Sequence, residues 1–152
     1  IRAMQIAASY LPGASDAAHN PSDYVPELSR RARGFATWAL IRHFGRKRIA
    51  EMITRHCACA RRFAEKLAAE AGVEILNDVA LNQVAVRFGN AEQTKAVIAR
   101  IQAGGVTFVG GAQWRDHWIM RISVSSEKTT EADVDRSVEA MLEAWRAVRG
   151  RN

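Results

Sequence analysis

The sequence predicts an α+β fold: a two-layer sandwich in which helices cover one face of a sheet of about four, mainly antiparallel, strands. Two observations carry this prediction. Apolar residues recur with a helical period in several long stretches, and shorter stretches between them have the spacing of strands. The chain has 152 residues, 48% hydrophobic and 25% charged, which suits one globular domain with its own core.

The amino-terminal part of the chain predicts a loop and two helices. Residues 10–26 are rich in turn formers and show no apolar period, so we expect a loop there. A helix should follow over 29–44, capped by Ser29, with Gly45 ending it. A longer helix is indicated over 49–67 by its 3.6-residue apolar period.

The middle of the chain predicts two strands and a helix. Val73–Leu76 and Gln83–Phe88 have the composition of strands, and in the second one apolar and polar side chains alternate. Asn90 and Gln93 have the spacing of a helix cap, so we expect a helix that begins there and ends at Gly104. The period of the sequence therefore changes from helix to sheet and back.

The last third predicts a strand pair and a final helix. We expect strands at Val106–Val109 and Trp118–Ser125, joined in antiparallel fashion. The turn residues between them are two glycines and the polar pair Arg115–Asp116. Thr130, three residues before Asp133, should cap the last helix.

One residue of the strand Trp118–Ser125 is a candidate for binding. Side chains alternate along a strand, so Met120 and Ile122 should face the helices and Arg121 the opposite side. Arginine presents a rigid fork of donors that can grip a carboxylate or phosphate in bidentate fashion. The alternative is an arginine in solvent with its stem packed on neighbours, and Arg87 has the same two interpretations.

Charge and cysteine content restrict the partners and the compartment. The net charge of +6 raises nucleic acid or an anionic membrane as partners. Cys57 and Cys59 lie two positions apart in a predicted helix, which does not favour a disulfide, and we expect a cytoplasmic protein. Residues 1–8 lack the basic start and long apolar middle of a secretory signal, and no apolar run is long enough for a membrane span. Since the chain begins at Ile1, we expect a piece of a longer protein.

Several segments, taken in order, resemble landmarks of the group II pyridoxal-dependent decarboxylases. That family includes aromatic-amino-acid, histidine, glutamate and diaminobutyrate decarboxylases. The segments are Ala8-Ser9-Tyr10-Leu11-Pro12, Glu27-Leu28-Ser29-Arg30-Arg31-Ala32-Arg33-Gly34-Phe35, Trp38, Leu81-Asn82-Gln83-Val84-Ala85-Val86-Arg87-Phe88 and Trp118-Ile119-Met120-Arg121-Ile122-Ser123-Val124-Ser125. The resemblance covers nearly the whole chain and implies the small domain of a fold-type-I pyridoxal phosphate enzyme.

The resemblance also implies a division of the chain and two site residues. Residues 1–28 would be the remnant of a large domain with its mobile catalytic loop, and 29–152 the carboxy-terminal small domain. Tyr10 falls at the loop tyrosine that gives a proton to the substrate carbon, a role that suits a phenol. Arg121 falls at the arginine that pairs with the α-carboxylate of the amino-acid substrate. The intact enzyme is expected to be a homodimer.

The cofactor of that family is expected to lie outside this chain. Pyridoxal phosphate needs a Schiff-base lysine beside a histidine, an acidic partner for its ring nitrogen and a phosphate cradle. The sequence shows none of these, and its histidines lack the spacing of a metal site. We therefore expect no cofactor or metal on this chain and no activity when it is alone.

Two other functions stay open at this point. The chain could be a stand-alone interaction module that pairs with a full-length decarboxylase. It could also bind nucleic acid through its basic residues, but these spread around two helices without interleaved aromatics, so we expect neither nucleic acid nor membrane as a partner. The basic residues are Arg30, Arg31, Arg33, Arg42, Arg46, Lys47, Arg48, Arg55, Arg61 and Arg62.

Overall fold

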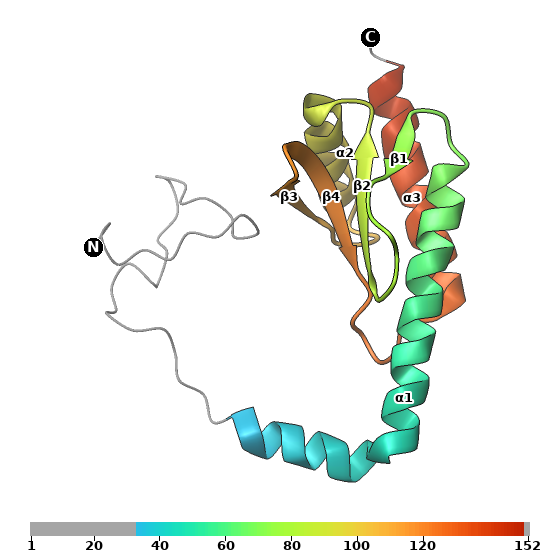
Figure 1. Ribbon diagram of the computed structural model, residues 1–152. Helices are drawn as coiled ribbons and strands as arrows, with labels where there is room; N and C mark the ends of the chain where they lie inside the picture. Colours follow the sequence, from blue (N-terminus) through green and yellow to red (C-terminus); the bar gives the residue numbers. More distant parts are fainter. Residues whose placement is uncertain (1–32, 151–152) are drawn as a thin grey trace, which may run out of the picture.

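The computed structural model describes residues 33–150, which form three helices and four strands (Figure 1). No helix among these residues is both long and apolar enough to cross a membrane. In chain order the elements are α1 (Arg33–Ala68), β1 (Val73–Ile75), β2 (Gln83–Phe88), α2 (Ala91–Gly104), β3 (Gly110–Trp114), β4 (His117–Ser123) and α3 (Glu131–Arg149).

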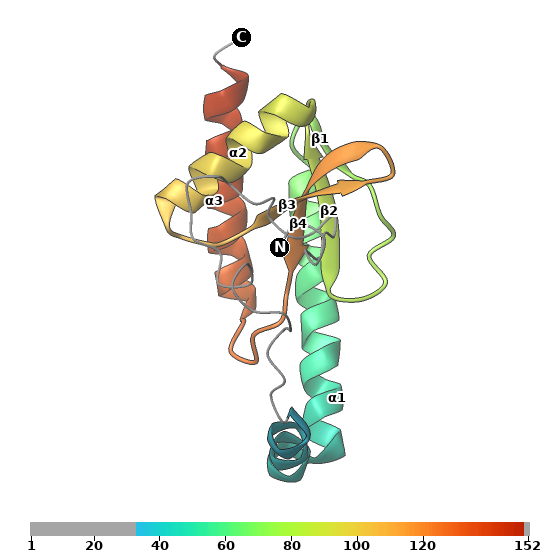
Figure 2. The ribbon, with the colours of Figure 1, turned by 90° about the vertical axis from the view of Figure 1, so that its left-hand side faces the viewer.

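The four strands form one antiparallel sheet in the order β1-β2-β4-β3, so β2 and β4 are its interior strands. One face of the sheet packs against the helices, as Figures 1 and 2 show. The main core joins Val84 and Met120 of the sheet to Leu67 of α1, Val97 of α2 and Met141 of α3. The predicted α+β sandwich with helices on one face is therefore confirmed.

The predicted helix end at Gly45 is confirmed, because α1 consists of two helical segments with non-helical backbone between them. Its bend lies at Gly45, whose φ of 69° and ψ of 170° are accessible to glycine and to few other residues. Figure 1 shows the segment before Gly45 turned away from the rest of the helix. The apolar side chains of that segment, Phe35 and Trp38, are largely exposed. The predicted cap at Ser29 lies outside the described residues.

The predicted strand Val106–Val109 is wrong, because the strand that pairs with β4 is β3, Gly110–Trp114. The backbone oxygen of Val109 accepts a hydrogen bond of 2.8 Å from the Gln102 side chain, and Val109 is not paired with a residue of β4. Phe108, in the middle of the predicted strand, is 82% exposed.

The β3–β4 connection is a tight hairpin made by the polar pair that the sequence singled out. Trp114 pairs with His117, which leaves Arg115 and Asp116 as a two-residue loop. Both have positive φ, 44° and 64°, which matches the twist of a hairpin turn. The antiparallel connection is confirmed, whereas the two preceding glycines belong to the strand and not to the turn.

The two predicted helix caps that lie within the described residues are confirmed. Asn90 and Gln93 exchange hydrogen bonds of 2.9 and 3.1 Å at the start of α2. Thr130 and Asp133 form the same reciprocal arrangement at the start of α3. Each pair satisfies backbone N–H groups that a helix start leaves without partners.

Candidate functional site

Arg121 lies on the sheet face that no described helix covers. It occupies interior strand β4, where its neighbours across the ladder are Ala85 of β2 and Gly110 of β3. The residues before and after it, Met120 and Ile122, are buried on the helix side, whereas Arg121 is exposed. The predicted orientation is confirmed, and a small residue on each side leaves room around the guanidinium group.

Arg121 has no hydrogen-bond or ion-pair partner within residues 33–150, and this distinguishes it from Arg87, the other arginine of β2 and β4 on the same face. Arg87 donates from Nη2 to Glu74 Oε2 at 2.6 Å, and from Nη1 to His117 Nδ1 at 3.2 Å. Because a guanidinium can only donate, His117 accepts through an unprotonated Nδ1. Arg87 is thus neutralised by its neighbours, and Arg121 is the arginine that remains available on these strands.

The rest of the face is apolar near its centre. Ala85, Ala112 and Ile119 form a small cluster there, with Leu76 and Trp114 packed against it. These residues come only from the sheet and the segment after β1, so the cluster is separate from the main core. An apolar floor beside an unpaired arginine suits a ligand, or a second protein surface, that carries an anionic group.

Two other predictions concern the chemistry of the site. Tyr10 lies outside the described residues, so its predicted role as proton donor stays a prediction. The lysines that the structure places are occupied or exposed: Lys47 pairs with Glu51, Lys66 with Asp135 and Lys95 with Glu92, and Lys128 is exposed. No group of three metal-ligating side chains occurs within 33–150. All four of these lysines are exposed, which does not suit a Schiff-base lysine for pyridoxal phosphate.

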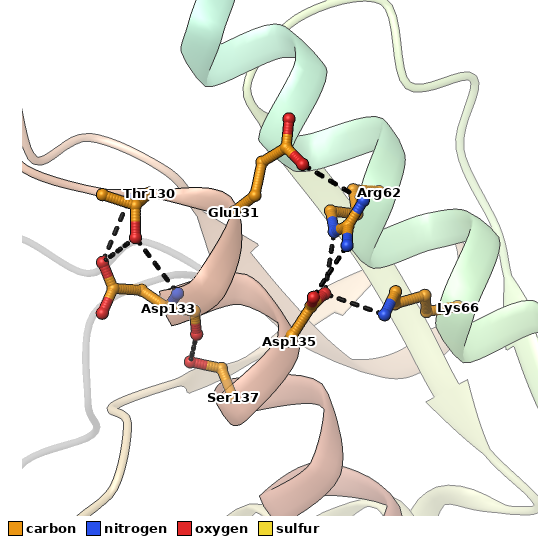
Figure 3. Close-up of polar contacts among 7 residues, drawn as sticks. All are labelled: Arg62, Lys66, Thr130, Glu131, Asp133, Asp135 and Ser137. Atoms are coloured by element: carbon orange, nitrogen blue, oxygen red, sulfur yellow. Dashed lines mark hydrogen bonds and ion pairs between the residues drawn. The ribbon is translucent and has the colours of Figure 1, made fainter.

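A charged cluster fastens α1 to α3, as Figure 3 shows. Arg62 donates from Nε and Nη2 to the two carboxylate oxygens of Asp135, at 2.7 Å each, and Lys66 Nζ lies 2.8 Å from the same carboxylate. The hydrogen bonds from Arg62, then the one from Lys66, hold the pKa of Asp135 well below its usual range. Arg62 also lies 3.3 Å from Glu131. This cluster is on the helix layer and stabilises the support of the sheet.

The structure also gives a role to a histidine that sequence reasoning left without one. His56 is buried in α1, and its Nε2 lies 2.9 Å from the backbone oxygen of Ser126, so Nε2 carries the proton and donates. Next to it, Arg55 donates to the backbone oxygen of Glu127. Both bonds hold the loop between β4 and α3 against α1. The only signal in the sequence was a histidine on the apolar side of a helix.

Comparisons with known proteins place the chain in a family. The conserved domain of the pyridoxal-dependent decarboxylases matches residues 1–89. An aromatic-L-amino-acid decarboxylase of Drosophila lebanonensis is 30% identical over 111 residues, which cover 72% of this chain and 28% of the relative. A 4-hydroxyphenylacetaldehyde synthase of Rhodiola rosea is 27% identical over 89% of this chain and 29% of its own length. The chain thus spans less than a third of each of these relatives.

Solved structures agree with the fold. The crystal structure of the Rhodiola rosea synthase superposes with a TM-score of 0.69 at 25% identity, covering 78% of this chain and 27% of that one. The Oryza sativa TDC with PLP and tryptamine superposes with a TM-score of 0.70 at 19% identity, over the same shares, and supports the fold alone. Since the conserved domain matches more than half of the residues, the chain belongs to the group II pyridoxal-dependent decarboxylase family.

Proposed function

We propose that this chain is the carboxy-terminal small domain of a pyridoxal-phosphate-dependent amino-acid decarboxylase, in which Arg121 binds the α-carboxylate of the substrate. The observation that carries the proposal is the unpaired Arg121 on the open sheet face, between Ala85 and Gly110. A carboxylate accepts two parallel hydrogen bonds from a guanidinium, which fixes its orientation as well as its position. Family membership supports the reaction class.

The remaining parts of the site would come from elsewhere in a longer protein. Residues 1–28 would belong to the large domain and its catalytic loop, and 29–152 to the small domain. Tyr10 would give a proton to the substrate carbon that has lost carbon dioxide. The large domain would hold pyridoxal phosphate, two subunits would form a homodimer, and this chain alone would be inactive. The poor fit of the described lysines to the cofactor supports this division.

The nucleic-acid alternative receives less support from the structure. Several of the basic residues on α1 are engaged within the protein: Arg62 with Asp135, Arg55 with Glu127 and Lys47 with Glu51. The two ion pairs, of Arg62 and Lys47, reduce the charge that the helix offers to a phosphate backbone, whereas Arg55 meets only a backbone oxygen.

The proposal is tested on the protein that the natural gene encodes, whose intact mass is measured first. With added pyridoxal phosphate, carbon dioxide release is then followed from aromatic amino acids, histidine and glutamate. Arg121→Gln should lower kcat/KM by about 30-fold to 160-fold, because a charge-assisted hydrogen bond contributes roughly 2–3 kcal/mol. Arg121→Lys should retain part of the activity. Arg100→Gln, on exposed α2, is the matched control and should behave like the unchanged protein.

Two results would contradict the proposal. One is an Arg121→Gln enzyme whose kcat/KM equals that of the Arg100→Gln control. The other is a natural gene product of 16.8 kDa, the mass of this chain, that releases carbon dioxide from an amino acid without any partner.

A further inference from the structure

The two glycines that begin β3 differ in what the fold requires of them. A Cβ atom on Gly111 would lie 2.8 Å from Cζ2 of Trp118, so packing under the helices excludes a side chain there. A Cβ atom on Gly110 would meet no atom of the described residues within 4 Å. Neither glycine has a positive φ. Within the described residues, neither packing nor backbone conformation explains the glycine at 110.

A glycine without a structural reason is unfavourable in this position. Glycine weakens a strand because it loses more backbone freedom than other residues and offers no side chain to its neighbours. β3 is an edge strand of five residues, so a branched side chain at 110 should strengthen it. Glycine inside a strand often marks a place where a ligand or another backbone comes close.

Gly110 stands directly beside the candidate carboxylate-binding residue. It pairs with Arg121 across the β3–β4 ladder, and paired residues place their Cβ atoms about 5 Å apart on the same face. On the other side of Arg121 the paired residue is Ala85, which is also small. A side chain at 110 would therefore stand next to the guanidinium stem and fill the space beside it.

We infer that Gly110 is a specificity-determining position, whose missing side chain leaves the space that the carboxylate bound by Arg121 occupies. This inference rests on the proposed function for the nature of the ligand. It adds that the space beside Arg121, and not the arginine alone, selects a small planar anion. Glycine at 110 then lowers the stability of the strand and keeps this space open, a trade-off that occurs at binding sites.

The test uses the 152-residue chain and the arginine-specific reagent phenylglyoxal, with the rate at each arginine read by peptide mass mapping. Gly110→Val should slow modification of Arg121 several-fold and leave the rate at Arg100, on α2, unchanged. Its melting temperature should equal or exceed that of the unchanged chain. Acetate should protect Arg121 in the unchanged chain while acetamide at equal concentration should not, and this protection should be lost in Gly110→Val.

Two outcomes would overturn the inference. The first is an unchanged rate at Arg121 in a Gly110→Val chain that keeps its melting temperature. The second is a lower melting temperature in both Gly110→Val and Gly110→Ala, which would mean that folding requires the glycine. If Gly110→Val slows the reaction but acetate gives no protection, the control of access by Gly110 is supported, and the carboxylate role of Arg121 under the proposed function fails.

Discussion

Removing the hydroxyl group of Thr94 is the sharpest single test of how the helix layer is joined to the sheet. Thr94 lies in the first turn of α2 and is fully buried. Its Oγ1 accepts a hydrogen bond of 3.0 Å from the backbone nitrogen of Phe88, and donates one of 3.1 Å to the backbone oxygen of the same residue. One side chain therefore satisfies both backbone groups at the end of β2.

Thr94→Val removes both bonds and keeps the volume, because a methyl group replaces the hydroxyl. Phe88 is fully buried, so water cannot easily reach its N–H and C=O groups. An unsatisfied buried group costs about 1–3 kcal/mol, and two of them with partial relaxation should lower the free energy of unfolding by about 2–4 kcal/mol. For a domain of this size the melting temperature should fall by on the order of 10 °C.

Urea unfolding, followed by circular dichroism, measures the change in free energy. The matched control is Thr107→Val, the same chemical change at a half-buried residue whose side chain makes no hydrogen bond within the described part of the chain. The control should stay within about 0.5 kcal/mol of the unchanged chain. If Thr94→Val also stayed within that range, the two bonds to Phe88 would not stabilise the fold and the reasoning would be refuted.

Two further predictions concern the glycine pair and the charged cluster. Gly111→Ala should lower the melting temperature because its Cβ would collide with Trp118, whereas Gly110→Ala should not; equal effects in thermal unfolding would contradict this. Asp135→Asn should destabilise the chain at neutral pH. Because the folded pKa of Asp135 is lowered, its contribution is complete above the unfolded value of about 3.9 and is lost as pH falls further. The difference in melting temperature between the unchanged chain and Asp135→Asn should therefore narrow below about pH 4. If this difference stayed constant below pH 4, the ion pair between Asp135 and Arg62 could not be its cause.

The parts of the fold with a strong local signal could be predicted from the sequence. Alternation placed Met120 and Arg121 on opposite faces, because the period of two along a strand allows no other arrangement once one face is buried. The reciprocal caps at Asn90 and Thr130 could also be predicted, since their partners lie three residues away.

β3 was missed because its strand character comes from its partner. Its sequence, Gly-Gly-Ala-Gln-Trp, has low strand propensity, whereas the preceding Val106–Val109 has a high one. The tight turn at Arg115–Asp116 fixes which residues can pair with β4. Gly110 and Gly111 therefore pair with β4, and Val106–Val109 does not. Tertiary pairing thus overrode local propensity.

The candidate site could be predicted only in part for a similar reason. The sheet face on which Arg121 lies follows from alternation. The hydrogen bonds that engage Arg87, however, come from Glu74 and His117, which lie 13 and 30 residues away in the chain. No local pattern in the sequence reports which of two arginines is already neutralised.

The interior position of β4 has a consequence for how firmly Arg121 is held. Strands bond to β4 along both of its edges, so its backbone amides should exchange with solvent only when much of the sheet opens. The backbone that carries Arg121 is fixed before any ligand arrives. Under the proposed function, binding would have to immobilise the arginine side chain alone, and the entropy lost would be smaller than for an arginine on a loop.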